Sequence, residues 1–121
     1  MVSVGATENA LMTAVLCKGK STLHNAAREP EIVDVADCLI KMGARIEGAG
    51  TSTIRIEGVP RLKAARHAVL PDRIETGTYA MATAMTGGDV MLAGARPDLL
   101  EDALETLRHA GAEIDATNEG I

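Results

Sequence analysis

Aromatic side chains are almost absent from this 121-residue sequence, which contains no Phe, no Trp and a single Tyr. A packed core is still expected, because 46% of the residues are hydrophobic and such a share is ordinary for globular proteins. Ala, Leu, Ile, Val and Met must therefore fill this core. The length suits one ordinary domain or two small ones.

Cysteine is also scarce, and two residues are too few for a disulfide framework. Cys17 and Cys38 form no CxxC pair and have no histidine at zinc-ligand spacing, so we expect simple thiols in a cytoplasmic protein. The three histidines share no spacing, no cofactor motif is present, and neither a metal nor a cofactor is expected. There is no signal peptide pattern, and the apolar runs are shorter than the ~20 residues that span a bilayer.

Basic residues are outnumbered, with 12 Lys and Arg against 17 Asp and Glu and a formal net charge of −5. This balance opposes counterion-driven binding, so neither nucleic acid nor a membrane is an expected partner. The densest basic stretch, Arg61 to His67, is short and has no interleaved aromatic residues, which indicates a solvated linker. An anionic ligand would have to be held by a local site.

An internal repeat emerges when the sequence is shifted by 68 positions, which places Met42–Glu47 on Ala110–Asp115. Each copy predicts a first helix that is apolar on nearly all sides, at Asn9–Cys17 and at Thr78–Met85. Helices of this kind are usually buried. We expect the glycines that follow, at positions 19 and 87, to end these helices.

The remainder of each copy predicts a strand, a second helix with one apolar stripe, and a further strand. A final strand at Thr53–Glu57 completes a β-α-β-α-β-β unit in the first copy. The second copy stops at Ile121, the match of Thr53, and would lack its last strand. The sequence thus predicts an α/β fold of two repeat units, the second incomplete, and indicates a piece of a longer protein. The other predicted elements are strands Ser21–Asn25, Asp89–Ala93 and Ala44–Glu47, and helices that begin near Pro30 and Pro97 and end at Gly43 and Gly111.

Three segments, Val2–Asn9, Asn25–Asp34 and Leu70–Thr78, resemble motifs of the UDP-N-acetylglucosamine enolpyruvyl transferases and occur in the same order. The resemblance covers essentially the whole chain but only the middle of the family's much longer sequence. It implies an inside-out α/β fold of two lobes, each made of such units around buried helices. Residues 1–69 would resemble the end of the catalytic lobe and residues 70–121 the truncated start of the second lobe, with a hinge near residues 68–71.

The resemblance also implies a transferase activity, in which enolpyruvyl moves from phosphoenolpyruvate to the 3-hydroxyl of UDP-N-acetylglucosamine during peptidoglycan synthesis. The family's Lys-Asn pair, catalytic Cys loop and phosphate-binding cations are not in this sequence, so we assign no catalytic residue. Cys17 ends a predicted helix and is no substitute for the loop cysteine. We therefore expect the chain alone to be inactive. The alternative is a non-catalytic α/β fragment or a small interaction module.

Ser3, Val4 and Gly5 are the first candidate site residues, at a predicted junction between a strand and a helix. Free backbone N–H groups at a helix N-terminus suit an anionic or polar ligand. An ordinary turn is the alternative that the residues leave open, whereas the resemblance implies contact with the UDP-sugar. The sequence departs from the family in having Met1 where a lysine usually stands.

Four charged residues are secondary candidates. Asp72 and Glu75 form a capping-box pattern, and acidic residues on both sides of Pro30 suit a helix N-terminus. These structural roles explain the charges by themselves, while the resemblance implies that they also approach the cleft between the lobes. The secondary cleft candidates are Glu29, Glu31, Asp72 and Arg73.

Units drawn from two different lobes would bury little apolar surface against each other. Small cores are marginal, and large exposed apolar patches promote association. We therefore expect the isolated chain to be marginally stable or to self-associate.

Overall fold

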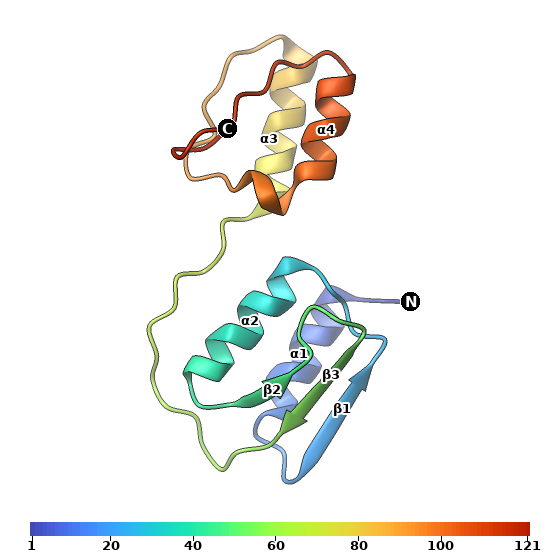
Figure 1. Ribbon diagram of the computed structural model, residues 1–121, viewed down its shortest axis with the longest axis vertical. Helices are drawn as coiled ribbons and strands as arrows, with labels where there is room; N and C mark the ends of the chain where they lie inside the picture. Colours follow the sequence, from blue (N-terminus) through green and yellow to red (C-terminus); the bar gives the residue numbers. More distant parts are fainter. The chain divides into compact units, whose positions relative to one another are not determined.

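The computed structural model describes all residues from 1 to 121 and divides the chain into two compact units, Met1–Leu70 and Pro71–Ile121 (Figure 1). The assignment of these units to two lobes stays a prediction. The first unit has an α-β-α-β-β order, in which a three-stranded sheet is covered by two helices. Its elements are α1 (Val4–Ala14), β1 (Lys20–His24), α2 (Pro30–Lys41), β2 (Arg45–Glu47) and β3 (Thr53–Glu57).

The central strand of this sheet is β3, which pairs antiparallel with β1 on one side and with β2 on the other. Side chains of a strand alternate between its two faces, so Arg55 and Glu57 lie on the face opposite to Ile54 and Ile56. Arg55 pairs in register with Glu47, and Glu57 with Arg45, whose guanidinium forms an ion pair with it. Opposite charges therefore occupy neighbouring positions on the exposed face, which stabilises the register modestly.

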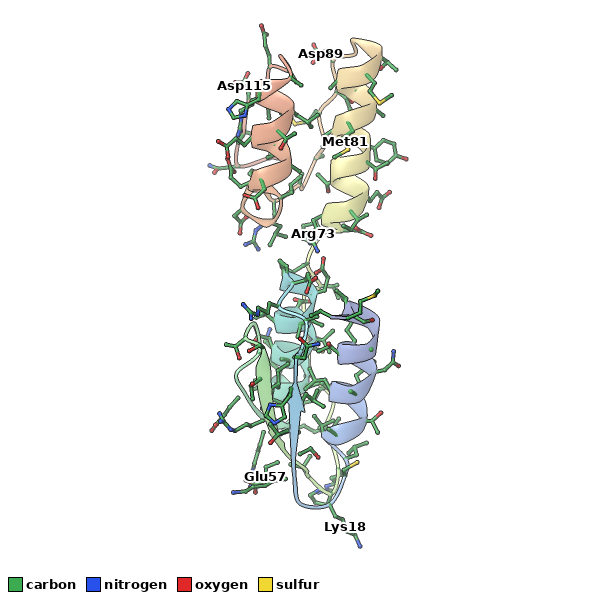
Figure 2. All side chains as sticks on the ribbon, turned by 90° about the vertical axis from the view of Figure 1, so that its right-hand side faces the viewer. Lys18, Glu57, Arg73, Met81, Asp89 and Asp115 are labelled. Atoms are coloured by element: carbon green, nitrogen blue, oxygen red, sulfur yellow. The ribbon has the colours of Figure 1, made fainter.

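The core of the first unit lies between the inner face of the sheet and the two helices (Figure 2). Ile54 and Ile56 are almost fully buried there, against the apolar faces of α1 and α2. No aromatic ring contributes, in agreement with the composition. The remaining buried members are Leu11, Ala14, Val15, Ala26, Ala27, Ile32, Ala36, Leu39 and Ala44.

The first helix differs from its prediction in position and in burial. It begins at Val4 and ends at Ala14, and the chain then turns, so that Cys17 is exposed beyond the helix end. Only one face of α1 is buried, at Thr7, Leu11 and Ala14. The expectation of a helix buried on all sides is wrong for this unit, because a single sheet covers one face of a helix and no second layer covers the other.

The second unit contains two helices with no sheet between them. They are α3 (Arg73–Thr86) and α4 (Glu101–His109), and a short helical turn, η1 (Pro97–Leu99), precedes α4. Gly87 ends α3 with a φ of 67°, the left-handed conformation predicted for this glycine. The only buried large side chains are Leu100 and Leu104, so this unit has a much smaller core than the first.

The two copies of the repeat share their helices but not their strands. Shifting α1 and α2 by 68 residues places them close to α3 and α4. The predicted strand Asp89–Ala93 and the segment that follows Gly111 form no strands, and isolated bridges at Ala93 and Thr117, both to Gly120, stand in their place. The leading strand predicted for the first copy is absent as well, because residues 1–3 have no strand partner. The general α/β class is confirmed, and so are the strands predicted as β1, β2 and β3 of the first unit, whereas its leading strand and the strands of the second unit are not formed.

Hydrogen bonding explains the missing strands of the second unit. In the first unit both outer strands pair with β3 and not with each other. In the second unit no strand occupies the position of β3. Leu92 and Ile121 nevertheless exchange backbone hydrogen bonds at 2.8 and 3.4 Å, and they correspond under the same shift to His24 and Thr53, which pair in β1 and β3.

We expect backbone amides of β3 to exchange with solvent on the order of 100-fold more slowly than those of residues 89–96 and 112–121. The first unit opens only by exposing a core of 11 residues, whereas the second exposes little apolar surface. Hydrogen exchange followed by NMR at single residues tests this. Equal protection in both units would show that the second is stabilised by interactions beyond its small core.

Candidate functional site

The N-terminus of α1 carries the three principal candidates. Ser3 is the N-cap, with extended backbone, and its Oγ accepts a hydrogen bond from the N–H of Ala6 at 3.2 Å. The helix then starts at Val4, and both Ser3 and Gly5 are exposed. A helix thus starts at the Ser3–Gly5 turn, five residues before Asn9, where the apolar pattern predicted its start. The backbone N–H groups of Val4 and Gly5 remain open to a ligand.

Thr7 connects this helix start with the loop before α2. Its side chain is buried, with 7% exposure. The hydroxyl donates to the carbonyl oxygen of Ser3 at 2.8 Å and accepts from the N–H of Ala27 at 3.0 Å. One side chain therefore fixes the position of the Ser3–Gly5 turn relative to the segment that leads to Glu29. Sequence reasoning missed this role, because the contact joins residues 20 positions apart and no local pattern marks it.

A recess of about 460 Å³ lies beside these two segments. Asn25 adopts a left-handed backbone conformation, with a φ of 57°, at the point where the chain leaves β1. The next residue, Ala26, donates its N–H to the carbonyl oxygen of Ser52 at 3.1 Å, which ties the loop to the residues just before β3. The recess is lined by Val2, Asn25, Ala26, Arg28, Glu29 and Ser52.

The start of α2 places Glu29 and Glu31 as the sequence predicted. Pro30 occupies the first turn, and Glu29 is the N-cap residue. The Glu29 carboxylate accepts a hydrogen bond from the N–H of Arg28 at 2.8 Å, and it makes no capping bond to the helix. Glu29 lines the recess and Glu31 does not. The structure thus brings Glu29, but not Glu31, to the recess near the N-terminus of α1.

Asp72 and Arg73 lie at the start of α3 in the second unit. The Asp72 carboxylate caps this helix by accepting from the N–H groups of Ile74 and Glu75, at 2.8 and 3.0 Å. This confirms that Asp72 is a helix cap. The two residues line different recesses, of about 430 Å³ for Asp72, beside Tyr79, and about 440 Å³ for Arg73. Their approach to an interlobe cleft stays a prediction.

One charged pair borders the Arg73 recess. Arg96 donates from Nε to an Asp98 carboxylate oxygen at 2.9 Å, and this hydrogen bond is the main reason why the pKa of Asp98 is lowered from its usual value. Asp98 lines the same recess as Arg73. The pair is exposed to solvent, so screening leaves it a small contribution to stability.

The chemical groups at these sites suit binding more than bond making. Backbone N–H groups, the Asn25 amide, the Arg28 guanidinium and the Ser52 hydroxyl can hold polar or anionic ligand atoms.

No group of three or more His, Cys, Asp or Glu side chains is arranged to hold a metal ion. Cys17 is exposed, and its thiol contacts the carbonyl oxygen of Thr13. No helix of the chain is long and apolar enough to cross a membrane.

The chain belongs to the EPSP synthase (3-phosphoshikimate 1-carboxyvinyltransferase) family, whose sequence profile matches residues 1–121. Within this family it is similar in sequence to UDP-N-acetylglucosamine 1-carboxyvinyltransferases. It is 82% identical to the one of Xanthobacter autotrophicus, 78% identical to that of Azorhizobium caulinodans and 67% identical to that of Agrobacterium fabrum. These matches confirm the resemblance drawn from the three sequence motifs.

Each of these alignments covers 120 residues, which is 99% of this chain but 28% of the relative. The chain therefore spans less than a third of the length of the proteins that it matches. Within it, the candidate site residues lie at the turn at Ser3, at the recess around Asn25 and at the helix start at Asp72.

We expect Thr7→Val to lower the free energy of unfolding of the first unit by about 1–3 kcal/mol, because the buried N–H of Ala27 loses its acceptor. Urea unfolding followed by NMR signals from residues 1–70 measures this. Thr13→Val is the matched control, since the Thr13 hydroxyl bonds only to Asn9 in the same exposed helix face, and it should cost less than about 0.5 kcal/mol. Equal effects of the two variants would contradict the bridging role, and Thr7→Ser should retain most of the stability.

Proposed function

We propose that this chain forms part of an enzyme that transfers enolpyruvyl from phosphoenolpyruvate to the 3-hydroxyl of UDP-N-acetylglucosamine, in the cytoplasm, during peptidoglycan synthesis. The observation that carries the proposal is 82% identity across nearly the whole chain to a protein named UDP-N-acetylglucosamine 1-carboxyvinyltransferase. Identity at this level extends through the loops as well as the core, which a shared fold alone does not require.

In this proposal the N-terminus of α1 and the recess beside it contact the nucleotide sugar. Ser3, Val4 and Gly5 offer backbone N–H groups at the positive end of a helix. Asn25, Arg28 and Ser52 add amide, guanidinium and hydroxyl groups along the recess. The Thr7 hydroxyl holds the two segments together, so a ligand that touches both meets a site whose geometry is already set.

The types of side chain near these sites also explain why we expect no turnover from the chain alone. Enolpyruvyl transfer needs a proton at the methylene carbon and cations around the departing phosphate, and each type of group contributes orders of magnitude in rate. The charged side chains near the turn and at the start of α3 are mostly carboxylates, namely Glu29, Glu31 and Asp72. These carboxylates would repel anionic phosphoenolpyruvate.

Exposed apolar side chains support the expectation that the isolated chain self-associates. Met85 is 86% exposed, and Ile74 and Tyr79 of the same helix are more than half exposed. Large apolar side chains exposed to this extent favour association in water. This observation also keeps open the alternative of a small interaction module, although no partner is indicated by it.

We expect no phosphate release above background when this chain is incubated with UDP-N-acetylglucosamine and phosphoenolpyruvate. A colorimetric phosphate assay over hours tests the absence of turnover. Release that persists in Cys17→Ser but is lost in Asp72→Ala would overturn the expectation, because it would reveal chemistry at the start of α3.

We also expect UDP-N-acetylglucosamine to bind with millimolar or weaker affinity, since most of the contacts of a complete site lie outside this chain. NMR shift changes should concentrate at residues 3–7 and 25–29 and should be weaker for N-acetylglucosamine without the nucleotide. Ser52→Ala, which removes one recess hydroxyl, should weaken binding modestly. Changes confined to α4, or none at all up to 20-fold molar excess over a roughly millimolar chain, would contradict the proposed site.

A further inference from the structure

The segment after β3 has no regular secondary structure, yet it is attached to the first unit at several points between residues 58 and 67. Gly58 passes so close to the end of α1 that an added Cβ would lie 1.5 Å from the carbonyl oxygen of Cys17. The backbone N–H of Val59 donates to the carbonyl oxygen of Val15 at 2.8 Å, and the backbone N–H of Lys63 donates to the carbonyl oxygen of Met42 at 2.9 Å. The segment therefore follows first α1 and then the C-terminal end of α2, as Figure 1 shows for its course beside α2.

His67 makes the last attachment of this segment. Its side chain is 8% exposed and lies against α2, where Nε2 is 2.9 Å from a carboxylate oxygen of Asp34, itself 15% exposed. The other ring nitrogen, Nδ1, is 2.9 Å from Nζ of Lys41. Asp34 and Lys41 are seven residues apart in the helix, two turns on one face, so the imidazole bridges side chains from backbone positions about 10 Å apart along α2.

The chemistry of the neighbours fixes the tautomer of His67. A lysine ammonium group can only donate, so Nδ1 must accept from Lys41. Nε2 then carries the proton and donates it to the Asp34 carboxylate. Neutral imidazole with the proton on Nε2 is the only form that makes both hydrogen bonds.

Beyond His67 the attachments cease. Ala68, Val69 and Leu70 make no backbone hydrogen bond, and Val69 is 78% exposed. The next fixed residue is Asp72, which caps α3. The segment between β3 and α3 therefore includes residues 58–72, but its unattached part is only residues 68–70.

We propose that the Asp34–His67–Lys41 cluster is a clasp that fastens residues 58–67 to α2 and confines rotation of the connecting chain to residues 68–70. The basic stretch that the sequence presents as a solvated linker is then a strap belonging to the first unit. Its charged side chains Arg61, Lys63 and Arg66 are exposed, while its backbone is hydrogen-bonded to the first unit at Gly58, Val59 and Lys63. The proposal does not depend on the enzymatic activity proposed above.

Limited trypsin digestion tests the clasp, because Arg61, Lys63 and Arg66 give cleavage sites within the strap. A protease needs several residues of unfolded backbone, so the cleavage rate reports how often the strap opens. His67→Ala should raise the rate at the Lys63–Ala64 bond about tenfold through the loss of two side-chain hydrogen bonds. The bond after Arg66 is a poor reporter, since this substitution changes the residue next to it.

Lys41→Met leaves the strap sequence unchanged and removes only the lysine donor, so it should raise the same rate by a smaller factor of about three. His24→Ala is the matched control, because His24 is an exposed histidine on β1, and it should cleave at the wild-type rate. Cleavage after Arg55, in the central strand β3, gives an internal reference for the fold of the first unit. Synthetic peptides of residues 58–70 with either residue at position 67 correct for intrinsic susceptibility.

Two outcomes would overturn the clasp. In one, His67→Ala is cleaved at Lys63 no faster than the wild type. In the other, cleavage after Arg55 accelerates equally, which would mean that the whole unit opens and the strap has no separate attachment. Long-range ¹H–¹⁵N NMR of the imidazole provides a second test, since the clasp requires the proton on Nε2, and the Nδ1–H tautomer would refute it.

Discussion

Strand β3 is the element on which the first unit depends. It supplies hydrogen bonds to both other strands, and its inner side chains, Ile54 and Ile56, form the surface on which the helices pack. Its sequence alternates between polar and apolar residues, so burial fixes which face is inward, and a shift by one residue would expose both isoleucines. The second unit shows the same dependence, because without a central strand its outer segments form only isolated bridges.

The candidate site takes its geometry from this arrangement. The start of α2 lies near the end of the sheet where β1 finishes and β3 begins. Here the N–H of Ala26 donates to the carbonyl oxygen of Ser52, and the N–H of Ala27 donates to the hydroxyl of Thr7. The recess around Asn25 is therefore a consequence of strand pairing and helix packing. Polar groups on loops held by a rigid sheet are a common arrangement for ligand binding, which is consistent with the family to which the chain belongs.

Sequence and structure agree where local rules decide. Pro30 starts α2, Gly87 stops α3 and Asp72 caps it, as predicted, and the predicted limits of β3 are the observed ones. They differ at α1, which lies several residues earlier than predicted, and in the second unit, whose predicted strands are missing. An apolar segment can indicate a strand, but a strand forms only when a partner satisfies its backbone groups, and periodicity carries no information about that partner.

The sequence by itself determined the family, the start of α2 at Pro30, the stop of α3 at Gly87, the alternation of β3 and the motif residues Ser3, Glu29 and Asp72, because each of these depends on residues close together in the chain. Only the tertiary structure decided that Thr7 joins two motifs 20 residues apart, that Glu29 lines the recess while Glu31 does not, and that His67 fastens an apparent linker across 33 positions to Asp34. Contacts at such separations arise from the packing of helices and strands against one another. No local pattern of residue types encodes them.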